Sequence, residues 1–350
     1  MTIEARMIRY PVETPPETGS AIEIADGILW LRFPLPMALD HVNIYALDDG
    51  DGWTLIDTGL DTRKSRAIWD AALSGPLAGK PVRRVVITHH HPDHIGLAGW
   101  FMEQGAELVI PRTAYLTARM LILDEQPRYT EEAIGFYRRA GMDPNILQAR
   151  ADERPFNFAD CVTALPAGFT RIAEGDTIRM AGRIWDIRMG DGHAPEHATF
   201  WSRDNHLVLG GDQLLPSISP NIGVYPTEPE ANPLAEWLDS CTAFQPHARE
   251  EHLVLGGHKL PYIGLPTRLS QLIENHTGAL QRLTEHLAQP RRGGECFAPL
   301  FKREIQPNTY GLALVEALAH LNYLRQSGQA IRWLGDDGAY RWQSTGSPPA

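Results

Sequence analysis

The chain has 350 residues, 43% of them hydrophobic, and a formal net charge of -11. This length accommodates one large domain with a small one, or two domains. The acidic charge disfavours binding to phosphate backbones, and no stretch approaches the ~20 apolar residues that a membrane span needs. Three isolated cysteines without a CxxC pair indicate neither a disulfide framework nor a thiolate metal site.

The first 20 residues are rich in Pro and Glu and contain no apolar segment. We therefore expect an irregular arm rather than a signal peptide, and a cytoplasmic protein. Short apolar segments bounded by Gly and Asp then predict a series of strands, at residues 22–24, 28–33, 42–47 and 53–57. A helical pattern follows at 62–77, and a strand at 81–88 leads into a cluster of histidines.

Residues 88–94 read Thr-His-His-His-Pro-Asp-His. Side chains alternate along an extended backbone, so His89 and His91 point the same way and His90 points the other way. Asp93 and His94 follow where the chain turns into a helix, and they can serve a second cation. An accidental histidine cluster in a polar loop is the alternative, but matching residues occur further along the chain.

The next segments predict a helix at 95–104 and a strand at 107–110. Residues 112–158 are helix-like and contain Met and aromatic side chains, so this insertion either caps a site or packs on the sheet as ordinary helices. Strands resume at 177–180, 183–188, 198–201, 207–210 and 253–255, with a proline-rich loop and a short helix before the last. Two β-rich halves with helices outside predict an α/β sandwich of two sheets.

After Pro266 the composition changes, and nine Lys or Arg face seven Asp or Glu. Helical patterns and a hairpin around a Gly-Asp-Asp-Gly turn follow, at 267–287, 296–303, 309–325 and 331–342. Three helices and a hairpin are typical of a winged-helix-like module. We therefore expect a catalytic domain at 1–265, with the helical insertion at about 112–158, and a C-terminal domain at 266–350.

Three further residues match the histidine cluster because each follows a strand and has glycine beside it: His193, Asp212 and His258. Asp57 ends its own strand in the same way. Nitrogen and carboxylate donors without thiolate suit Zn²⁺, although Fe and Mn also tolerate them.

Taken in order, these motifs resemble the metallo-β-lactamase-fold hydrolases: Asp57-Thr58-Gly59, His89-x-His91-x-Asp93-His94, Gly192-His193-x-Pro195, Gly211-Asp212 and Gly257-His258. The resemblance covers roughly residues 20–262 and implies an αββα sandwich of two mixed β-sheets. It also implies one metal held by His89, His91 and His193, and another held by Asp93, His94 and His258. Asp212 would bridge the two metals together with a hydroxide, and Asp57 would orient a ligand without binding metal.

Two divalent cations, expected to be Zn²⁺, would generate hydroxide near neutral pH and polarise the scissile bond. Asp93 or a metal-bound water would handle the proton of the leaving group, so Asp93 and Asp212 are the predicted catalytic residues. We predict a binuclear metal-dependent hydrolase that acts on a small-molecule thioester, ester or lactone. Substrate contacts are expected from an early loop and from the late loops, at His41, Tyr225, Lys259 and Tyr262.

Other functions stay open at this point. A winged-helix-like module after this fold resembles a subgroup with endoribonuclease-type members, but the acidic chain disfavours an RNA or DNA phosphodiesterase. The absence of a secretion signal disfavours a β-lactamase, and the complete ligand set disfavours a non-catalytic scaffold. A homodimer is a further option, with no membrane partner expected.

Overall fold

A computed structural model describes residues 7–301 and 303–346. The chain forms two compact units, each made of three segments. The first unit contains the segments that end at residues 125, 220 and 269, and the second contains residues 126–156, 221–244 and 270–350. This division differs from the expected boundary after residue 265, because two internal segments pack with the C-terminal helices.

The first unit contains a seven-stranded sheet whose strands follow chain order. Its first four strands pair antiparallel and its last four pair parallel. The strands are β1 (Ile22–Ala25), β2 (Ile28–Pro34), β3 (His41–Asp48), β4 (Trp53–Ile56), β5 (Val82–Val86), β6 (Glu107–Pro111) and β7 (Thr170–Ile172). The sequence did not predict β7, because three residues are too few to show a period.

The second sheet has the order β12-β11-β10-β9-β8. Strands β11 and β12 pair parallel, whereas the other neighbours pair antiparallel. The strands are β8 (Thr177–Met180), β9 (Arg183–Gly190), β10 (His197–Ser202), β11 (Leu207–Gly211) and β12 (Leu253–Gly256). Both sheets are therefore mixed, which confirms the predicted class of fold.

Two apolar clusters fill the first unit. On β3, Val42, Ile44 and Ala46 pack toward the helices, whereas Tyr45 and Leu47 join side chains of the second sheet. Because both faces of the first sheet are buried, β3 is an almost continuous apolar run instead of an alternating one.

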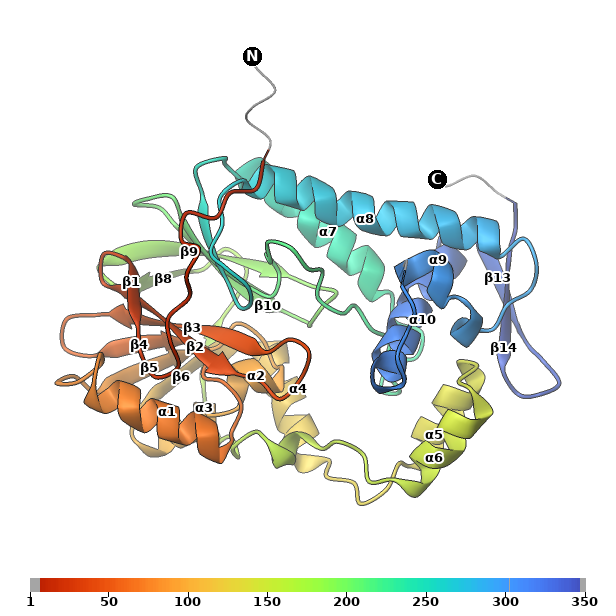
Figure 1. Ribbon diagram of the computed structural model, residues 1–350, viewed down its shortest axis with the longest axis horizontal. Helices are drawn as coiled ribbons and strands as arrows, with labels where there is room; N and C mark the ends of the chain where they lie inside the picture. Colours follow the sequence, from red (N-terminus) through yellow and green to blue (C-terminus); the bar gives the residue numbers. More distant parts are fainter. Residues whose placement is uncertain (1–6, 302, 347–350) are drawn as a thin grey trace, which may run out of the picture. The chain divides into compact units, whose positions relative to one another are not determined.

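The helices of the first unit are α1 (Arg63–Ser74), α2 (Pro92–Ile95), α3 (Ala98–Glu103) and α4 (Arg112–Leu123), with short 3-10 turns at Phe158–Asp160 and Gln245–His247. Helices α1 and α3 cover one face of the first sheet (Figure 1). The expected helix at 95–104 is divided, because the Leu97 N–H donates to Thr58 Oγ1 (3.0 Å) instead of to a helical carbonyl. Helix α4 is an ordinary helix on the sheet, since Ala114, Tyr115 and Ala118 enter the core.

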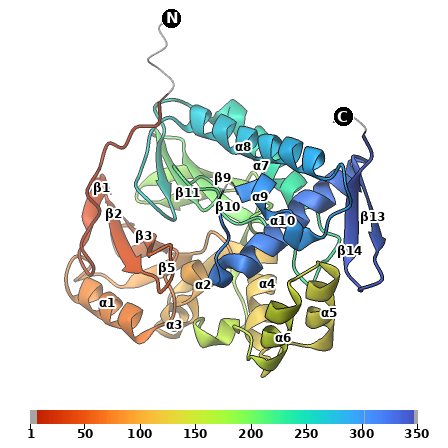
Figure 2. The same ribbon diagram turned by 45° about the vertical axis from the view of Figure 1, so that its right-hand side comes forward.

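The second unit contains the predicted three C-terminal helices and hairpin. Its elements are α5 (Glu131–Arg139), α6 (Pro144–Asp152), α7 (Pro233–Phe244), α8 (Leu265–His286), which starts in the first unit, α9 (Phe297–Phe301), α10 (Tyr310–Gln326), β13 (Ala330–Leu334) and β14 (Tyr340–Ser344), with 3-10 turns at Gly293–Glu295 and Pro307–Thr309. The hairpin lies beside α10, which is largely buried (Figure 2). The winged-helix arrangement itself stays a prediction.

None of the helices in the described ranges combines the length and the apolar character of a membrane span.

Candidate metal centre

Several candidate ligands, and Asp57 that supports one of them, follow the ends of strands that run parallel to a neighbour. Asp57 follows β4, and the histidine cluster follows β5, its parallel neighbour. Asp212 follows β11 and His258 follows β12, which are also parallel neighbours. The carboxyl ends of such strands meet at one edge of a sheet, where ligands bind in open α/β folds. Chain topology thus brings together residues that are more than 150 positions apart.

Three imidazoles converge at a first group of donors. His91 Nδ1 lies 2.9 Å from His89 Nε2 and 3.0 Å from His193 Nε2. His91 Nδ1 can share one proton with only one of its two neighbours. The other neighbouring nitrogen then has no hydrogen bond to His91 and lies at an unfavourably short distance from it. A cation, in contrast, accepts all three lone pairs. This arrangement therefore fits a metal better than it fits a hydrogen-bonded histidine cluster.

A second group joins two carboxylates to two imidazoles. Asp212 lies between the histidines, with its Oδ1 3.4 Å from His94 Nε2 and its Oδ2 3.2 Å from His258 Nε2. The same Oδ2 is 3.5 Å from His193 Nε2, so Asp212 reaches the first group as well. Asp93 Oδ2 is 3.6 Å from His94 Nε2 and 3.5 Å from His258 Nε2.

Outer hydrogen bonds fix the ring tautomers of two candidate ligands. His94 Nδ1 donates to Asp57 Oδ2 (2.8 Å), so Nε2 is the ring nitrogen that is left for a metal. The Thr88 hydroxyl donates to Asp57 (2.9 Å), so its oxygen accepts from His89 Nδ1 (3.0 Å). His89 Nε2 is then a free lone pair that faces the centre. Partners of this kind hold metal-binding histidines in orientation and raise their basicity.

The same logic applies to His258. Its Nδ1 donates to the backbone carbonyl of His41 (2.7 Å), and its Nε2 faces Asp93 and Asp212. The His41 ring accepts the N–H of Lys259 through Nε2 (2.9 Å), and its Nδ1 pairs with Asp40 (2.5 Å). His41 therefore supports a candidate ligand and does not itself join the donor groups, and its expected contact with substrate stays a prediction.

Among the described residues, His94 Nε2 and Asp212 Oδ1 are buried and make no hydrogen bond, and the two atoms interact only as an ion pair at 3.4 Å. Buried polar atoms in native proteins are almost always well partnered, so this long contact leaves room for a bound cation. The donors that could hold a metal form three overlapping sets: His89, His91 and His193; His89, His94 and Asp212; and Asp93, His94 and His258. The residues present fit divalent metal ions.

A family model described as Metallo-beta-lactamase superfamily matches residues 37–285. The chain belongs to this superfamily. A second model, the metallo-beta-lactamase-like C-terminal domain, matches residues 280–345. The chain is thus a metallo-hydrolase of the superfamily, with side chains that fit a metal site.

Among known members of the superfamily, the crystal structure of a beta-lactamase domain protein from Burkholderia ambifaria is 35% identical, with a TM-score of 0.89, and covers 97% of this chain and 98% of its own. The probable metallo-hydrolase YqjP of Bacillus subtilis (strain 168) is 25% identical over 324 residues, or 89% of this chain and 96% of that protein. The linear primary-alkylsulfatase of Pseudomonas sp. (strain ATCC 19151) is 25% identical over 206 residues, which are 56% of this chain and 38% of that protein.

Burial and charge have opposite effects on the donors of this superfamily site. Burial lowers the pKa of His89 and His91 well below the usual value for histidine, which keeps both rings neutral. Burial also lowers the pKa of His94, but the carboxylates of Asp212 and Asp93 outweigh it and raise that pKa well above its usual value. A cation at the centre would replace this proton, so metal binding releases protons.

Two glycines make room for the donors. A Cβ on Gly257 would lie 2.4 Å from Asp212 Oδ1 and 2.8 Å from His94 Cε1. Gly211 has a φ of +48°, and a Cβ there would lie 2.5 Å from His197 Cε1. The Gly-Asp and Gly-His pairs in the sequence are therefore explained by close approach of the backbone to a crowded centre.

The other predicted residues have different surroundings. His90 is buried against Phe158, with nearly parallel rings (11°), and does not face solvent. Tyr262 is fully buried, which argues against a contact between its side chain and substrate. Tyr225 belongs to the second unit and is 43% exposed, and its role stays a prediction.

The role of Thr88 and the hydrogen bond between Thr113 and Glu196 were not predicted from the sequence. Thr88 precedes the motif directly and binds both Asp57 and His89, so its position was the available signal. Glu196 accepts the N–H of Thr113 (2.5 Å) from the first turn of α4, a contact that nothing in the sequence indicates.

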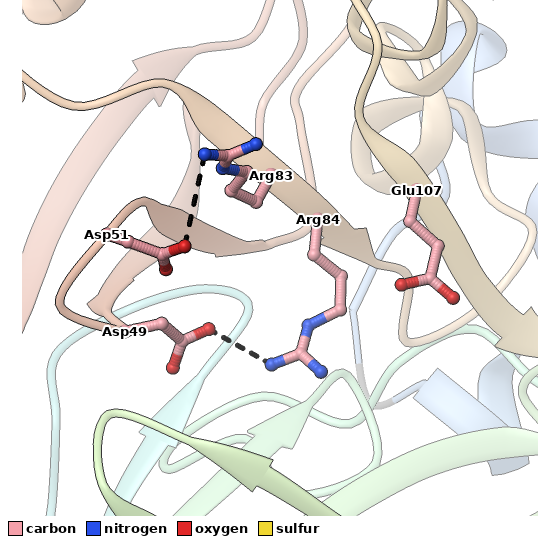
Figure 3. A pocket seen from close by; sticks show the side chains of 5 residues that line it. All are labelled: Asp49, Asp51, Arg83, Arg84 and Glu107. Atoms are coloured by element: carbon pink, nitrogen blue, oxygen red, sulfur yellow. Dashed lines mark hydrogen bonds and ion pairs between the residues drawn. The ribbon is translucent and has the colours of Figure 1, made fainter.

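A separate charged cavity of about 360 Å³ lies at the other end of the strands, near the β3–β4 turn and the start of β5 and β6 (Figure 3). Arg84 pairs with Asp49 (3.0 Å) and Arg83 lies 3.9 Å from Asp51. The lining contains three carboxylates, of which two pair with arginines, and it contains no histidine, so this cavity is not a second candidate for the metal site.

Proposed function

We propose that the chain is a binuclear hydrolase that binds two divalent cations, most suitably Zn²⁺, and cleaves a thioester, ester or lactone with an apolar tail. The observation that carries the proposal is the convergence of imidazole nitrogens and carboxylates on one largely buried centre. Ligands without thiolate suit Zn²⁺, with Fe and Mn as further options.

In this proposal, His89, His91 and His193 hold one cation, while Asp93, His94 and His258 hold the other. Asp212 lies within 3.5 Å of nitrogens from both sets, which suits a shared carboxylate. When bound, two such cations polarise the scissile bond and lower the pKa of a water, so that no Ser or Cys nucleophile is needed.

The carboxylates differ in access to solvent, which suggests different tasks. The Asp212 side chain is 8% exposed and lies between three imidazoles, so it suits holding the centre together. The Asp93 side chain is 18% exposed, so it can exchange protons with solvent while it remains beside His94 and His258. Asp93 is therefore the better candidate to take and return the proton of the leaving group.

A row of exposed apolar side chains on helix α4 supports the proposal that the substrate has an apolar tail. The first turn of the helix contacts the loop after His193, where the Thr113 N–H donates to Glu196, and the helix lies in the same unit as the centre. Opposite its core face it exposes three large apolar side chains between 46% and 72%: Leu116, Met120 and Leu123. Spacings of four and three residues place them on one stripe of about 10 Å. Contiguous exposed apolar side chains can mark a binding surface, and we infer that an acyl chain binds along this stripe.

The test is a turnover panel with metal-free protein that has been reloaded with Zn²⁺. Acyl thioesters, aryl esters and lactones of increasing acyl length are compared, and kcat/KM should rise by up to about fourfold per CH₂ that the stripe buries. Leu116→Ser should flatten this dependence, whereas Leu334→Ser, at a similarly exposed leucine of the C-terminal hairpin, should not. No turnover of any carboxyl substrate by metal-loaded protein would reject the substrate class.

A sulfate ester is the second candidate, because the chain is similar to a linear primary-alkylsulfatase over 206 residues. An alkyl sulfate also presents an apolar tail beside a head group that divalent cations can polarise. Primary alkyl sulfates belong in the same panel, and sulfate release that exceeds ester cleavage would replace the first candidate with this one.

A further inference from the structure

His197 is a fully buried histidine four residues after His193, and it is the first residue of β10. The geometry points to His197 as a positioning residue of the metal centre, which holds Asp212 and His89 in place and does not bind metal itself. This inference rests on the proposed metal centre, so its test must separate the two.

The first contact is with the backbone of Asp212. The Asp212 N–H donates to His197 Nε2 at 3.0 Å. That nitrogen is therefore a lone-pair acceptor, and the ring carries its proton at Nδ1. Without this acceptor the buried Asp212 N–H would lose its partner, and an unpaired buried donor is destabilising. The bond thus fixes the peptide from which the shared carboxylate projects.

The second contact is with the ring of His89. The two imidazoles stack with centroids 4.5 Å apart and planes inclined by 25°. His89 is held at its Nδ1 by Thr88, and the His197 ring supports one of its faces. His197 therefore touches a donor of the three-histidine group and the carboxylate that reaches both groups.

A role as ligand does not fit this side chain. His197 belongs to none of the three sets of converging donors, and its Nε2 is already engaged. Its Nδ1 is buried and makes no hydrogen bond within the described part of the chain. A buried imidazole with an unpartnered nitrogen is poor for stability, so the ring is better explained by what it does for Asp212 and His89.

Two variants separate the contacts. His197→Phe keeps a flat ring against His89 but removes the acceptor, whereas His197→Gln places a side-chain oxygen where Nε2 lies and removes the stacking. The matched control is His252→Phe, because His252 is also buried, accepts a backbone N–H from Arg249 (3.1 Å) and packs against Trp201.

The measurements are the Zn²⁺ affinities of the folded proteins by chelator competition and the visible spectrum of the Co²⁺ forms, with thermal unfolding of the metal-free proteins alongside. We expect His197→Phe to lose roughly 10–100-fold in affinity for at least one ion and to alter the Co²⁺ bands. His197→Gln should recover most of the affinity, and His252→Phe should match the parent.

The outcomes are distinct. Parent protein that binds no metal would refute the proposed centre and this inference together. Parent protein that binds two ions, with His197→Phe equal to it in affinity and spectrum, would refute the positioning role alone. A His197→Phe protein that does not fold leaves the Gln variant as the test, and loss of the Co²⁺ bands in a folded Gln variant would refute the acceptor role.

Discussion

Replacing Asp57 by Asn should weaken metal binding although Asp57 is expected to touch no metal. The Asp57 carboxylate accepts from the Thr88 N–H (2.8 Å) and from His94 Nδ1 (2.8 Å). An amide has only one accepting end. If the Asn oxygen stays on Thr88, its NH₂ faces His94 Nδ1, and the His94 proton must move to Nε2, the atom that faces Asp93 and Asp212.

The expected loss of metal affinity can be estimated for each of the two orientations of the side-chain amide in Asp57→Asn. With the His94 proton on Nε2, one donor of the second group is blocked, and losses of 10–100-fold, or about 1.4–2.8 kcal/mol, are typical for such outer partners. With the amide reversed, two N–H groups oppose each other at Thr88, and an unsatisfied buried donor costs about 1–3 kcal/mol. Chelator competition with Zn²⁺ measures the affinity of each site.

The expected signature is a selective loss. The site of Asp93, His94 and His258 should weaken, while that of His89, His91 and His193 should keep most of its affinity. Asp48→Asn is the control, because Asp48 pairs with Lys80 near the surface (2.6 Å) and away from the donors. Parent-like affinity at both sites in Asp57→Asn would show that the outer carboxylate does not set the His94 tautomer.

Three further predictions concern the centre and the second unit. Asp212→Ala should abolish hydrolysis while the circular dichroism spectrum stays that of the parent, and full activity in this variant would exclude a shared carboxylate. Removal of metal by a chelator should lower the free energy of unfolding by about 4 kcal/mol for an ion held at 1,000 times its Kd, and an unchanged denaturation midpoint would contradict a tightly held ion. Burial lowers the pKa of His276 to about 3 and that of His320 to about 4, so both stay neutral when folded. Because the pKa of each ring is lower in the folded than in the unfolded chain (6.5), the unfolded chain takes up protons first as the pH falls. The folded state therefore has its full stability above pH 6.5 and loses part of it as the pH falls toward 4. Urea unfolding should show that the free energy of unfolding of the parent falls between pH 7 and pH 5. In His320→Gln this fall should be smaller by about 2 kcal/mol. An equal fall in both proteins would refute the lowered pKa of His320.

Much of this protein could be read from short-range patterns. The apolar runs on β3 and β4, the helical pattern of α1 and the hairpin after α10 are local features, and the structure contains all of them. The histidine motif is local too, because the alternation of an extended backbone is enough to send His89 and His91 the same way. The sequence by itself therefore determined the class of fold and the general kind of chemistry, and it supplied the candidate donor residues.

Long-range pairing decided the rest. His91 Nδ1 and His193 Nε2 lie 3.0 Å apart although 102 positions separate the residues. They come together only because the two sheets pack against each other. The ring orientations depend on Asp57, Thr88 and the carbonyl of His41, which contact their histidines only in the folded chain. The role inferred for His197 depends on a ring stack and a backbone N–H that no spacing reveals. The division into units follows the same rule, because residues 126–156 and 221–244 join the C-terminal helices through packing, and packing depends on the surfaces that meet rather than on order along the chain.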